Sequence, residues 1–303
     1  MPKPKENLTT SVIIITRNRA KSLAACLSSI EKQSLLPTEV LVVDNASKDL
    51  TKKAVEKFHK SLHIVYLYEP RIGMPIARNT GMKRAQGEII LMLDDDCIAH
   101  TDWIAQASRS HMKYPHAWAM QGKVISIPRE SIYSLVLQQQ RNVRIKMSTL
   151  KHGGILYLDT ANCSFKRARL LKTNILFYET EKYIGPDVDL AAQIVVKGGF
   201  VVFDKSIVVY HQERSSLKSF LLQRYRNGVT PSIMKRRWPQ LKFHFYHAAI
   251  LLHIMNYFAL SKYLLKKKRY RDFFILPFIL IMAIAAFELA GFIESIQGKK
   301  KHL

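Results

Sequence analysis

The first third of the chain alternates between short β-branched runs and segments whose apolar residues recur at helical spacing, and this alternation restricts the fold most. The predicted strands are residues 11–16 (SVIIIT), 39–44 (EVLVVD), 63–68 (HIVYLY) and 88–93 (EIILML). The predicted helices between them cover residues 20–33, 50–60 and 75–87. Apolar strands joined by helices run parallel in one sheet that is buried on both faces. The pattern therefore predicts an α/β fold with a mostly parallel central sheet and helices on both faces.

Polar residues follow three of these strands at the point where each strand ends. Thr16 and Arg17 follow the first strand, Asp44 ends the second, and Asp94–Asp96 follow the fourth. Because ligands of parallel α/β sheets gather at the carboxyl edge of the strands, we expect a binding site there. The first strand-to-helix turn, TRNRA, contains no glycine, so the glycine-rich dinucleotide fingerprint is absent. A nicotinamide-dependent enzyme is therefore disfavoured.

The run Asp94–Asp96 places three carboxylates side by side, where their charges repel unless a cation holds them. Hard carboxylate oxygens suit a divalent cation, Mg²⁺ or Mn²⁺, which typically also binds substrate phosphates. In an extended chain Asp94 and Asp96 face the same side and share this ion, whereas Asp95 points away. The alternative is a solvated turn in which an aspartate caps the helix expected from Cys97 onward.

The composition narrows the class of partner. The 303 residues carry a net charge of +24, which indicates attraction to phosphates of a nucleotide, a lipid headgroup or a nucleic acid. The positive charge is densest beside hydrophobic segments and the acids cluster at strand ends, so we expect no nucleic acid. The three cysteines are widely spaced and show no C-x-x-C pattern, which indicates neither a disulfide framework nor a thiolate metal site.

The C-terminal part contains two apolar stretches. Residues 273–293 are 21 residues with a single charge, Glu288, which is close to the ~20 apolar residues that span a bilayer core. Residues 243–265 are also apolar but include three histidines, an asparagine and a lysine. Basic clusters follow each stretch at 266–271 and 298–302, so two full crossings would put one cluster on the disfavoured side. We expect membrane association, either re-entrant or interfacial; a hydrophobic hairpin in a soluble protein is the alternative.

Four motifs in order resemble the family 2 glycosyltransferases, which are inverting enzymes with the GT-A fold. They are SVIIITRNRAKSLAACLSSI, VLVVDNASKD, PRIGMPIARNTGMKRAQGEIILMLDDD and IGPDVDLAAQIVVKGG, and the resemblance runs from about residue 9 to residue 228. It implies a nucleotide-sugar donor, usually a UDP-sugar, and a divalent cation. We accordingly expect a GT-A catalytic domain at 1–228, with a nucleotide-sugar half at about 9–100 and an acceptor half at about 101–228. Membrane-associating helices would follow at 229–303.

The resemblance assigns the donor site. It makes Asp44 the contact to the nucleobase, since a carboxylate accepts the N3–H of uracil, and Arg17 a neighbour of the nucleotide together with Thr16. Arg71 and Arg78 lie in the segment that usually flanks the nucleotide. Asp44 could instead cap the following turn, and either arginine could be a surface salt-bridge partner.

The resemblance also divides the aspartate run between donor and metal. Asp94 corresponds to the residue facing the ribose, and Asp96 to the metal ligand of the D-x-D motif. We count Asp95 with the nucleotide-sugar site. His211 ends a β-branched run at the place where the family commonly has a histidine that reaches the metal or the diphosphate.

The same comparison identifies a catalytic base in YIGPDVDLAAQI. An inverting transfer is a single displacement that needs one carboxylate apart from the metal cluster. Asp187 is our base; Pro186 stands where family members often have a glutamate. Asp189 either supports Asp187 or favours the helix dipole. The alternative is that both aspartates merely begin a helix.

Two further regions are less decisive. In LLQRYRNG, Gln223 and Arg226 match the start of the Q-x-x-R-W motif of processive synthases, but Asn227 replaces the tryptophan. Arg226 either clamps the diphosphate or lines a basic helix against lipid headgroups. On the acceptor side we name Trp103 and Asn162, because aromatic and amide groups bind sugars.

These observations predict a glycosyltransferase on the cytoplasmic face of a membrane, the inner membrane of a bacterial cell, held there by its C-terminal hydrophobic segment. Its partners would be a nucleotide-sugar, a glycan or lipid-linked acceptor, and membrane lipids. Two alternatives remain open. A sugar-phosphate nucleotidyltransferase should show a glycine-rich phosphate loop near the N-terminus, which is missing. A non-catalytic basic protein that binds nucleic acid or membranes should bind RNA in a salt-dependent way without turning over any UDP-sugar.

Overall fold

A computed structural model describes residues 7–128, 131–150, 153–179, 185–213, 216–241 and 249–300. Of the predicted features, residues 243–248 of the first apolar stretch, Tyr183 and Ile184 of the base motif, and the last three residues lie outside this part. The chain divides into two compact units. The first comprises residues 1–125, 150–181 and 186–211, and the second comprises residues 126–149, 182–185 and 212–303.

The first unit is built on a sheet with strand order β3-β2-β1-β4-β7-β6-β8-β5. The strands are β1 (Thr10–Thr16), β2 (Glu39–Asp44), β3 (Ile64–Tyr68), β4 (Ile89–Met92), β5 (Cys97–Ala99), β6 (Ala119–Ile127), β7 (Cys163–Lys166) and β8 (Val201–Gln212). β1 pairs in parallel with β2 and β4, and β2 pairs in parallel with β3. The four predicted strands are thus confirmed, in the parallel arrangement expected. The later strands turn the sheet mixed, since β7 runs antiparallel to β4 and β6, and β5 runs antiparallel to β8.

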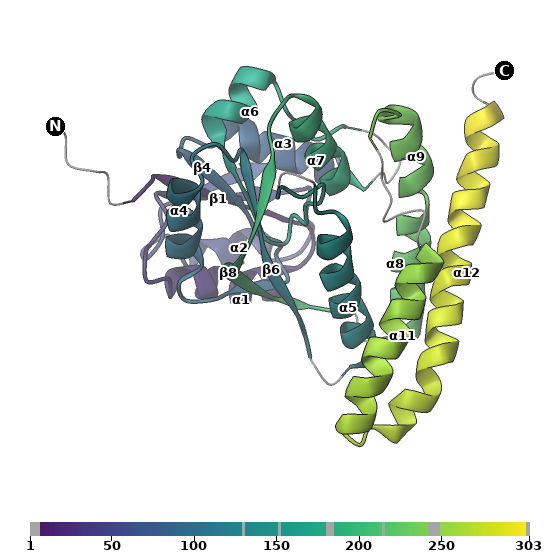
Figure 1. Cartoon of the computed structure of the whole chain (residues 1–303). Coiled ribbons are helices and arrows are strands. Elements are labelled where there is room, and N and C mark those ends of the chain that lie inside the picture. Colours follow the sequence, from purple (N-terminus) through teal and green to yellow (C-terminus); the bar gives the residue numbers. More distant parts are fainter. Residues whose placement is uncertain are drawn as a thin grey trace. The chain divides into compact units, whose positions relative to one another are not determined.

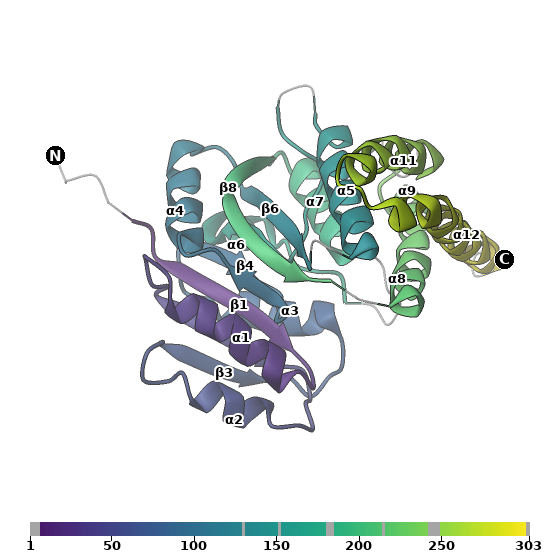
Figure 2. The same cartoon turned by 90° about the horizontal axis from the view of Figure 1, so that it is seen from below.

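Helices cover both faces of this sheet (Figures 1 and 2). They are α1 (Ala20–Glu31), α2 (Thr51–Glu56), α3 (Met74–Arg84), α4 (Trp103–Lys113), α6 (Arg167–Thr173) and α7 (Pro186–Val196). Successive residues of β1 point to opposite faces. Val12 and Ile14 share a core with α1 and α4, whereas Ile13 faces α3. At Gly81 of α3 an added Cβ would lie 2.7 Å from the Ile13 side chain, so glycine allows α3 to pack closely on the strand.

The second unit consists of helices. They are α5 (Ile132–Met147), α8 (Leu217–Gly228), α9 (Thr230–Arg237), α11 (Ala249–Lys266) and α12 (Tyr270–Lys300). Its core joins residues of α5, α8, α11 and α12: Val136, Leu137, Phe220, Leu260, Leu264, Leu276, Ile279, Leu280 and Ala283. The helical unit therefore begins before residue 229, where we expected a domain boundary, because α5 and α8 bury their apolar faces against the C-terminal helices. Deleting those helices would expose Phe220, which is fully buried.

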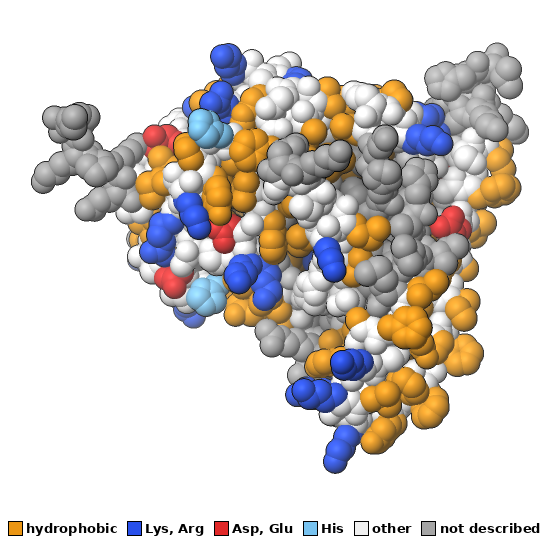
Figure 3. All heavy atoms as spheres, in the orientation of Figure 1, with side chains coloured by type: hydrophobic (Ala, Val, Ile, Leu, Met, Phe, Trp, Pro, Cys, Tyr) orange, Lys and Arg blue, Asp and Glu red, His pale blue; other side chains and the backbone are white. Residues whose placement is uncertain are grey.

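One helix among the described residues is long and apolar enough to cross a membrane. It covers Tyr270–Ile296 of α12, 27 residues that contain an 18-residue window with a mean hydropathy of 2.5. Figure 3 shows hydrophobic side chains gathered over α12 and the adjoining part of α11.

Candidate active site

The aspartate run follows β4 at the carboxyl edge of the parallel strands. The register pairs Thr16 with Asp44 across β1 and β2, and Leu93 donates its N–H to the Ile13 carbonyl at 3.1 Å. The run itself is not extended, because the Cys97 N–H donates to the Asp94 carbonyl at 3.0 Å and closes a turn. Our premise that Asp94 and Asp96 alternate with Asp95 along an extended chain was therefore wrong. In the turn, the three carboxylates have different partners, although Arg19 is shared by Asp95 and Asp96.

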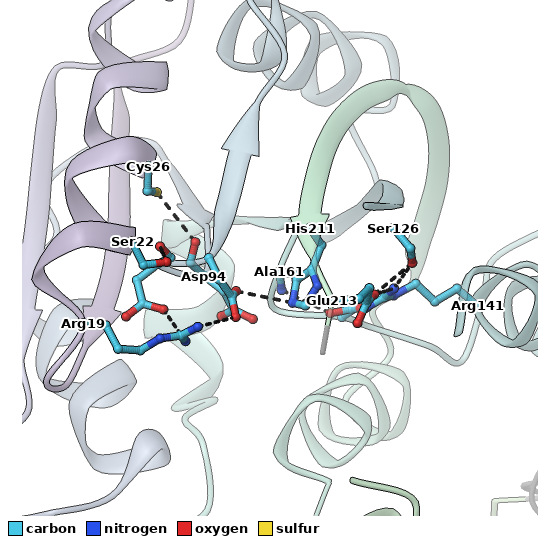
Figure 4. Close-up of polar contacts among 12 residues, drawn as sticks. Arg19, Ser22, Cys26, Asp94, Ser126, Arg141, Ala161, His211 and Glu213 are labelled. Carbon is cyan, nitrogen blue, oxygen red and sulfur yellow. Dashed lines mark hydrogen bonds and ion pairs between the residues drawn. The ribbon is translucent and has the colours of Figure 1, made fainter. Parts of the chain in front are cut away.

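Asp95 is buried and anchored to the first strand and helix. The Thr16 hydroxyl donates to Asp95 Oδ2 at 2.7 Å, and Arg19 Nη1 donates to Oδ1 at 2.7 Å. Burial raises the pKa of Asp95 to about 7 despite the opposing charge of Arg19. Arg19 also donates to Asp96 Oδ2 at 2.8 Å, so one guanidinium bridges two adjacent carboxylates (Figure 4).

Sequence reasoning missed Arg19 and named its neighbour Arg17, which is exposed. Both arginines stand in the same TRNRA turn, and no signal in the turn separates them. Asn18 between them has a left-handed backbone, with φ of 53°. The two arginines stand on either side of this kink, which is not visible in the pattern of residue types.

Asp96 also contacts His211, whose ring points toward the aspartate run in Figure 4. Their Oδ1 and Nε2 atoms are 3.3 Å apart, because the antiparallel pairing of β5 with β8 sets His211 opposite Cys97. Asp96, Cys97 and His211 offer ligand atoms within 4.8 Å of one another. Burial raises the pKa of the Cys97 thiol well above its ordinary value, so it stays protonated and is a poor ligand. A carboxylate oxygen and an imidazole nitrogen remain; the carboxylate suits Mn²⁺ or Mg²⁺, and the two donors together suit Mn²⁺ better than Mg²⁺.

Arg78 connects the aspartate run to the predicted base. Its buried guanidinium lies 3.2 Å from Asp94 Oδ1 through Nη2 and 3.4 Å from Asp187 Oδ1 through Nη1. The Phe177 ring lies 5.5 Å from the guanidinium carbon and covers it from one side. α3 and α7 thus supply one arginine and one aspartate to a single site.

Asp187 stands at the first turn of α7, where Pro186 begins the helix. Thr160 donates to it twice, from its hydroxyl at 3.2 Å and from its N–H at 3.4 Å. Burial raises the pKa of Asp187 to about 6, with Asp159 and Asp94 adding to the rise while Arg78 opposes it. A carboxyl group with this pKa is a carboxylate at neutral pH and a better proton acceptor than an ordinary aspartate.

The expected nucleotide contacts have local partners in the structure. Asp44 is buried; its Oδ1 accepts the Ser47 N–H at 2.8 Å, and its Oδ2 accepts the Tyr66 hydroxyl. Arg71 is exposed and donates to both oxygens of Glu69 at 2.9 Å. The hydrogen bonds from Arg71 lower the pKa of Glu69 to about 2.

Four other predicted residues take different places. Trp103 and Asn162 are buried, and the indole N–H donates to Asn162 Oδ1 at 2.8 Å. The Asn162 amide in turn donates to the carbonyls of Lys123 and Ile207, so we withdraw the acceptor assignment for this pair in favour of a packing role. Asp189 is buried and accepts from Gln193 at 2.8 Å. Arg226 is exposed on α8, in the helical unit.

Comparison with protein families and curated proteins gives consistent matches. The model of the family described as glycosyl transferase family 2 matches residues 11–172. The glycosyltransferase AglE of Haloferax volcanii is 37% identical over 99 residues, which are 31% of this chain and 32% of AglE. Poly(ribitol-phosphate) β-N-acetylglucosaminyltransferase TarS of Staphylococcus aureus is 36% identical over 102 residues, 32% of this chain and 18% of TarS. The matched part spans about a third or less of these curated relatives.

Solved structures resemble the chain over nearly its whole length. The mannosyltransferase PcManGT from Pyrobaculum calidifontis, in complex with GDP-Man and Mn²⁺, superposes with a TM-score of 0.64 at 23% identity. The superposition covers 95% of this chain and 89% of that one. Residues 1–349 of S. aureus TarS, in complex with UDP-GlcNAc, give a TM-score of 0.57 at 17% identity, over 96% of this chain and 92% of that one.

Proposed function

The chain belongs to glycosyl transferase family 2 and has the GT-A fold, and from this premise we propose that it transfers a sugar, with inversion, from a UDP-sugar to a membrane-proximal acceptor. The enzyme class, a nucleotide-sugar-dependent glycosyltransferase, follows from the family. The nucleotidyltransferase and the non-catalytic binder are thereby set aside. The identity of the nucleotide, the stereochemistry, the acceptor and the roles of individual residues are our proposals.

The observation that carries the proposal is the separation of two acidic groups by one arginine. Arg78 lies between Asp94, which belongs to the aspartate run, and Asp187, which belongs to another helix. An inverting displacement needs positive charge at the leaving diphosphate, which the aspartate run would supply by holding a cation, and a separate carboxylate beside the acceptor hydroxyl. Asp187 suits the second role, because its raised pKa is matched to taking a proton near neutral pH.

The proton transfer and the positioning of the base can then be assigned to individual residues. Asp187 takes the proton of the acceptor hydroxyl while that oxygen forms its bond to the anomeric carbon. The bond from this carbon to the diphosphate breaks from the opposite face, and its electron pair leaves with the nucleoside diphosphate. Thr160 and Arg78 hold the Asp187 carboxylate in place through their hydrogen bonds.

Donor binding uses the edge of the sheet. Asp44 would accept the uracil N3–H, and Asp94 and Asp95 would lie at the ribose side of the nucleotide. Asp96 and His211 would hold a divalent cation, which when bound neutralises charge on the diphosphate as a Lewis acid. Arg19, paired with Asp95 and Asp96 here, would turn toward the phosphates when the donor arrives.

The acceptor side is proposed from the C-terminal helices. The apolar α12 and the basic residues of the α11–α12 turn support attachment to the cytoplasmic face of a membrane. An enzyme held there acts most readily on a glycan or lipid-linked acceptor at the same surface. Assembly of a cell-surface glycan is therefore the setting that we propose.

The test is turnover with a panel of UDP- and GDP-sugars and a membrane lipid extract as acceptor source. Released nucleoside diphosphate is measured with Mn²⁺, with Mg²⁺ and with EDTA. We expect release from a UDP-sugar that depends on both the metal and the extract. Release from GDP-sugars alone would overturn the choice of uridine, and metal-independent release would overturn the cation site.

The rate of transfer should depend on pH through the base. Asp187 acts as a carboxylate, and burial raises its pKa to about 6. Protonation below that pH removes the base, so kcat should fall about tenfold per pH unit below ~6 and level off above it. Single-turnover rates between pH 4.5 and 8 check this, with circular dichroism recorded at each pH to exclude unfolding. A profile that stays flat down to pH 5 would contradict the assignment.

The nucleobase contact predicts a loss of affinity without loss of fold. A hydrogen bond to a charged group is worth about 1.5–3 kcal/mol, so Asp44→Ala should weaken UDP binding about 10- to 100-fold. Tyr66→Phe is the matched control: it removes the hydroxyl that donates to Asp44 but leaves the carboxylate that the uracil needs. Calorimetry of both variants should show the loss only for Asp44→Ala. Equal losses would assign Asp44 to the turn alone.

A further inference from the structure

Helix α12 has two apolar faces with different surroundings. One face is buried inside the helical unit: Leu276, Ile279, Leu280, Ala283, Phe287 and Ala290. The other face, which we call the outer stripe, is exposed: Phe274, Phe278, Ile281, Leu289, Phe292 and Ile296. Phe278 is 66% exposed, whereas Ile279 next to it is 2% exposed. On α11, Ile254, Phe258 and Leu265 are also exposed, and Figure 3 shows the hydrophobic surface that the two helices present.

The buried face of α12 packs against α8, and α8 and α9 both carry charged side chains. Its backbone touches α8, because a Cβ added at Gly228 would collide with the Phe287 carbonyl oxygen, and one added at Gly291 would lie 3.1 Å from the Gly228 carbonyl oxygen. Near the C-terminal end of α12, Arg236 of α9 donates to Glu294 at 2.7 Å. α8 and α9 also carry exposed cations: Lys218, Arg226 and Lys235.

This packing limits how deep α12 can sit in a bilayer. If α12 crossed the hydrocarbon core, α8 and α9 would be drawn to the same depth with their lysines and arginines. Charged side chains at that depth are costly and are found facing a protein interior or a water-filled cavity. The exposed cations of α8 and α9 have neither in the described part of this unit. An apolar surface on one side and charged helices on the other are typical of a helix that lies in the membrane interface.

The charge next to the outer stripe indicates which lipid surface fits. The turn from α11 to α12 exposes Lys266, Lys267 and Lys268, and Arg271 follows at the start of α12. Asp272 does not offset this cluster, because it pairs with Arg269. Juxtamembrane lysines and arginines are attracted to anionic headgroups.

We infer that α11 and α12 lie flat in one leaflet of an anionic membrane, with the outer stripe among the acyl chains, and that α12 does not cross the bilayer. The inference rests on the proposed function for the presence of a membrane and specifies how the protein meets it. It also implies that both ends of α12 stay on the side of the catalytic unit's nucleotide-sugar supply.

Cysteine labelling of the full chain distinguishes a flat helix from a crossing one. Arg271→Cys and Ser295→Cys, made singly, mark the two ends of α12; the native cysteines are buried and give little background. In a bacterial expression host, neither probe should react with an impermeant maleimide in intact spheroplasts. Both should react in inverted membrane vesicles. Reaction of either probe in intact spheroplasts would overturn the inference.

Vesicle binding tests the outer stripe and its partner. Phe278→Glu should lower co-sedimentation of the full chain with phosphatidylcholine–phosphatidylglycerol vesicles by about tenfold or more in partition coefficient. Leu171→Glu, at an exposed leucine of the first unit, is the control and should change it less than about twofold. Vesicles of phosphatidylcholine alone should bind the parent chain more weakly.

A second copy of the chain is the competing occupant of the outer stripe. If Phe278→Glu converts a dimer into a monomer and leaves vesicle binding unchanged, the stripe is a self-association surface and the inference is overturned. UDP release is measured on the same preparations. A parent chain that binds vesicles as expected but releases no UDP would count against the proposed function and leave the membrane inference standing.

Discussion

Asp187→Asn should lower kcat for sugar transfer by about 10²- to 10⁴-fold, because an amide cannot take the acceptor proton and general-base catalysis supplies a factor of this size. The fold should survive. The asparagine Oδ1 can still accept from Thr160, and Asn begins a helix about as well as Asp. Arg78 keeps its contact with Asp94 at 3.2 Å. UDP affinity should therefore stay within about threefold of the parent, since the proposed nucleotide contacts belong to other residues.

The measurement is kcat and UDP affinity in one preparation. Asp204→Asn is the matched control, because Asp204 also accepts from a hydroxyl, that of Ser110 at 2.7 Å, but lies outside the site. It should keep kcat within about threefold. Should Asp187→Asn transfer sugar as fast as this control, Asp187 is a helix-start residue and the base must be sought elsewhere, first at Asp189.

The fold of the first unit could be predicted because its signals are local. Each buried parallel strand is a short β-branched run, and each helix between them shows its own apolar spacing. Once strands are parallel, their last residues meet at one edge, and the register of Thr16 with Asp44 confirms this part of the site geometry. The predicted strand β1 and strand β2 match the structure within one residue at each end.

The internal arrangement of the site was harder to predict because it depends on contacts between distant residues. Arg78 and Asp187 are 109 residues apart in the chain, and neither local sequence indicates that the two side chains are in contact. Thr160 lies in a segment that we associated with the acceptor, yet its two donors hold the proposed base. The residue types showed that an arginine and two carboxylates were available, but only the tertiary fold brings Arg78 within 3.2 Å of Asp94 and 3.4 Å of Asp187.

Local turns account for the other differences. The aspartate run closes a turn instead of continuing β4, and Cys97–Ala99 form a strand where the alternative interpretation placed the start of a helix. A three-residue strand has too few residues for a periodic signal, and it forms here because β8 lies alongside it. That pairing is also what sets His211 beside Asp96. Asp96 and His211 were therefore named together from the sequence without the element that brings them side by side, and their role as metal ligands remains a proposal.

Asp96→Ala should lower sugar transfer about as much as Asp187→Asn does, but unlike that variant it should also weaken metal-dependent UDP binding. It removes the carboxylate of the proposed cation pair, and metal stabilisation of a leaving diphosphate is worth several kcal/mol, so transfer should fall by about a hundredfold or more. Arg19 would keep its 2.7 Å contact with Asp95, and the turn would keep its backbone hydrogen bond, so the site should remain folded. The diagnostic quantity is the ratio of UDP affinity with Mn²⁺ to that in EDTA. In the parent this ratio should exceed one clearly, and in Asp96→Ala it should approach one.

Two further variants show whether the change in the affinity ratio of Asp96→Ala comes from loss of a metal ligand. His211→Ala removes the other proposed ligand and should lower the same affinity ratio, by less than Asp96→Ala because the charged ligand of the pair remains. Asp102→Ala, which removes a carboxylate that accepts from Ser34 outside the site, should leave the ratio unchanged. If Asp96→Ala weakens UDP binding equally with and without Mn²⁺, the carboxylate acts on the nucleotide directly or through Arg19. The cation would then have to be held by other groups, with Asp94 the nearest candidate, because the charges of both Asp96 and His211 act on its carboxyl group.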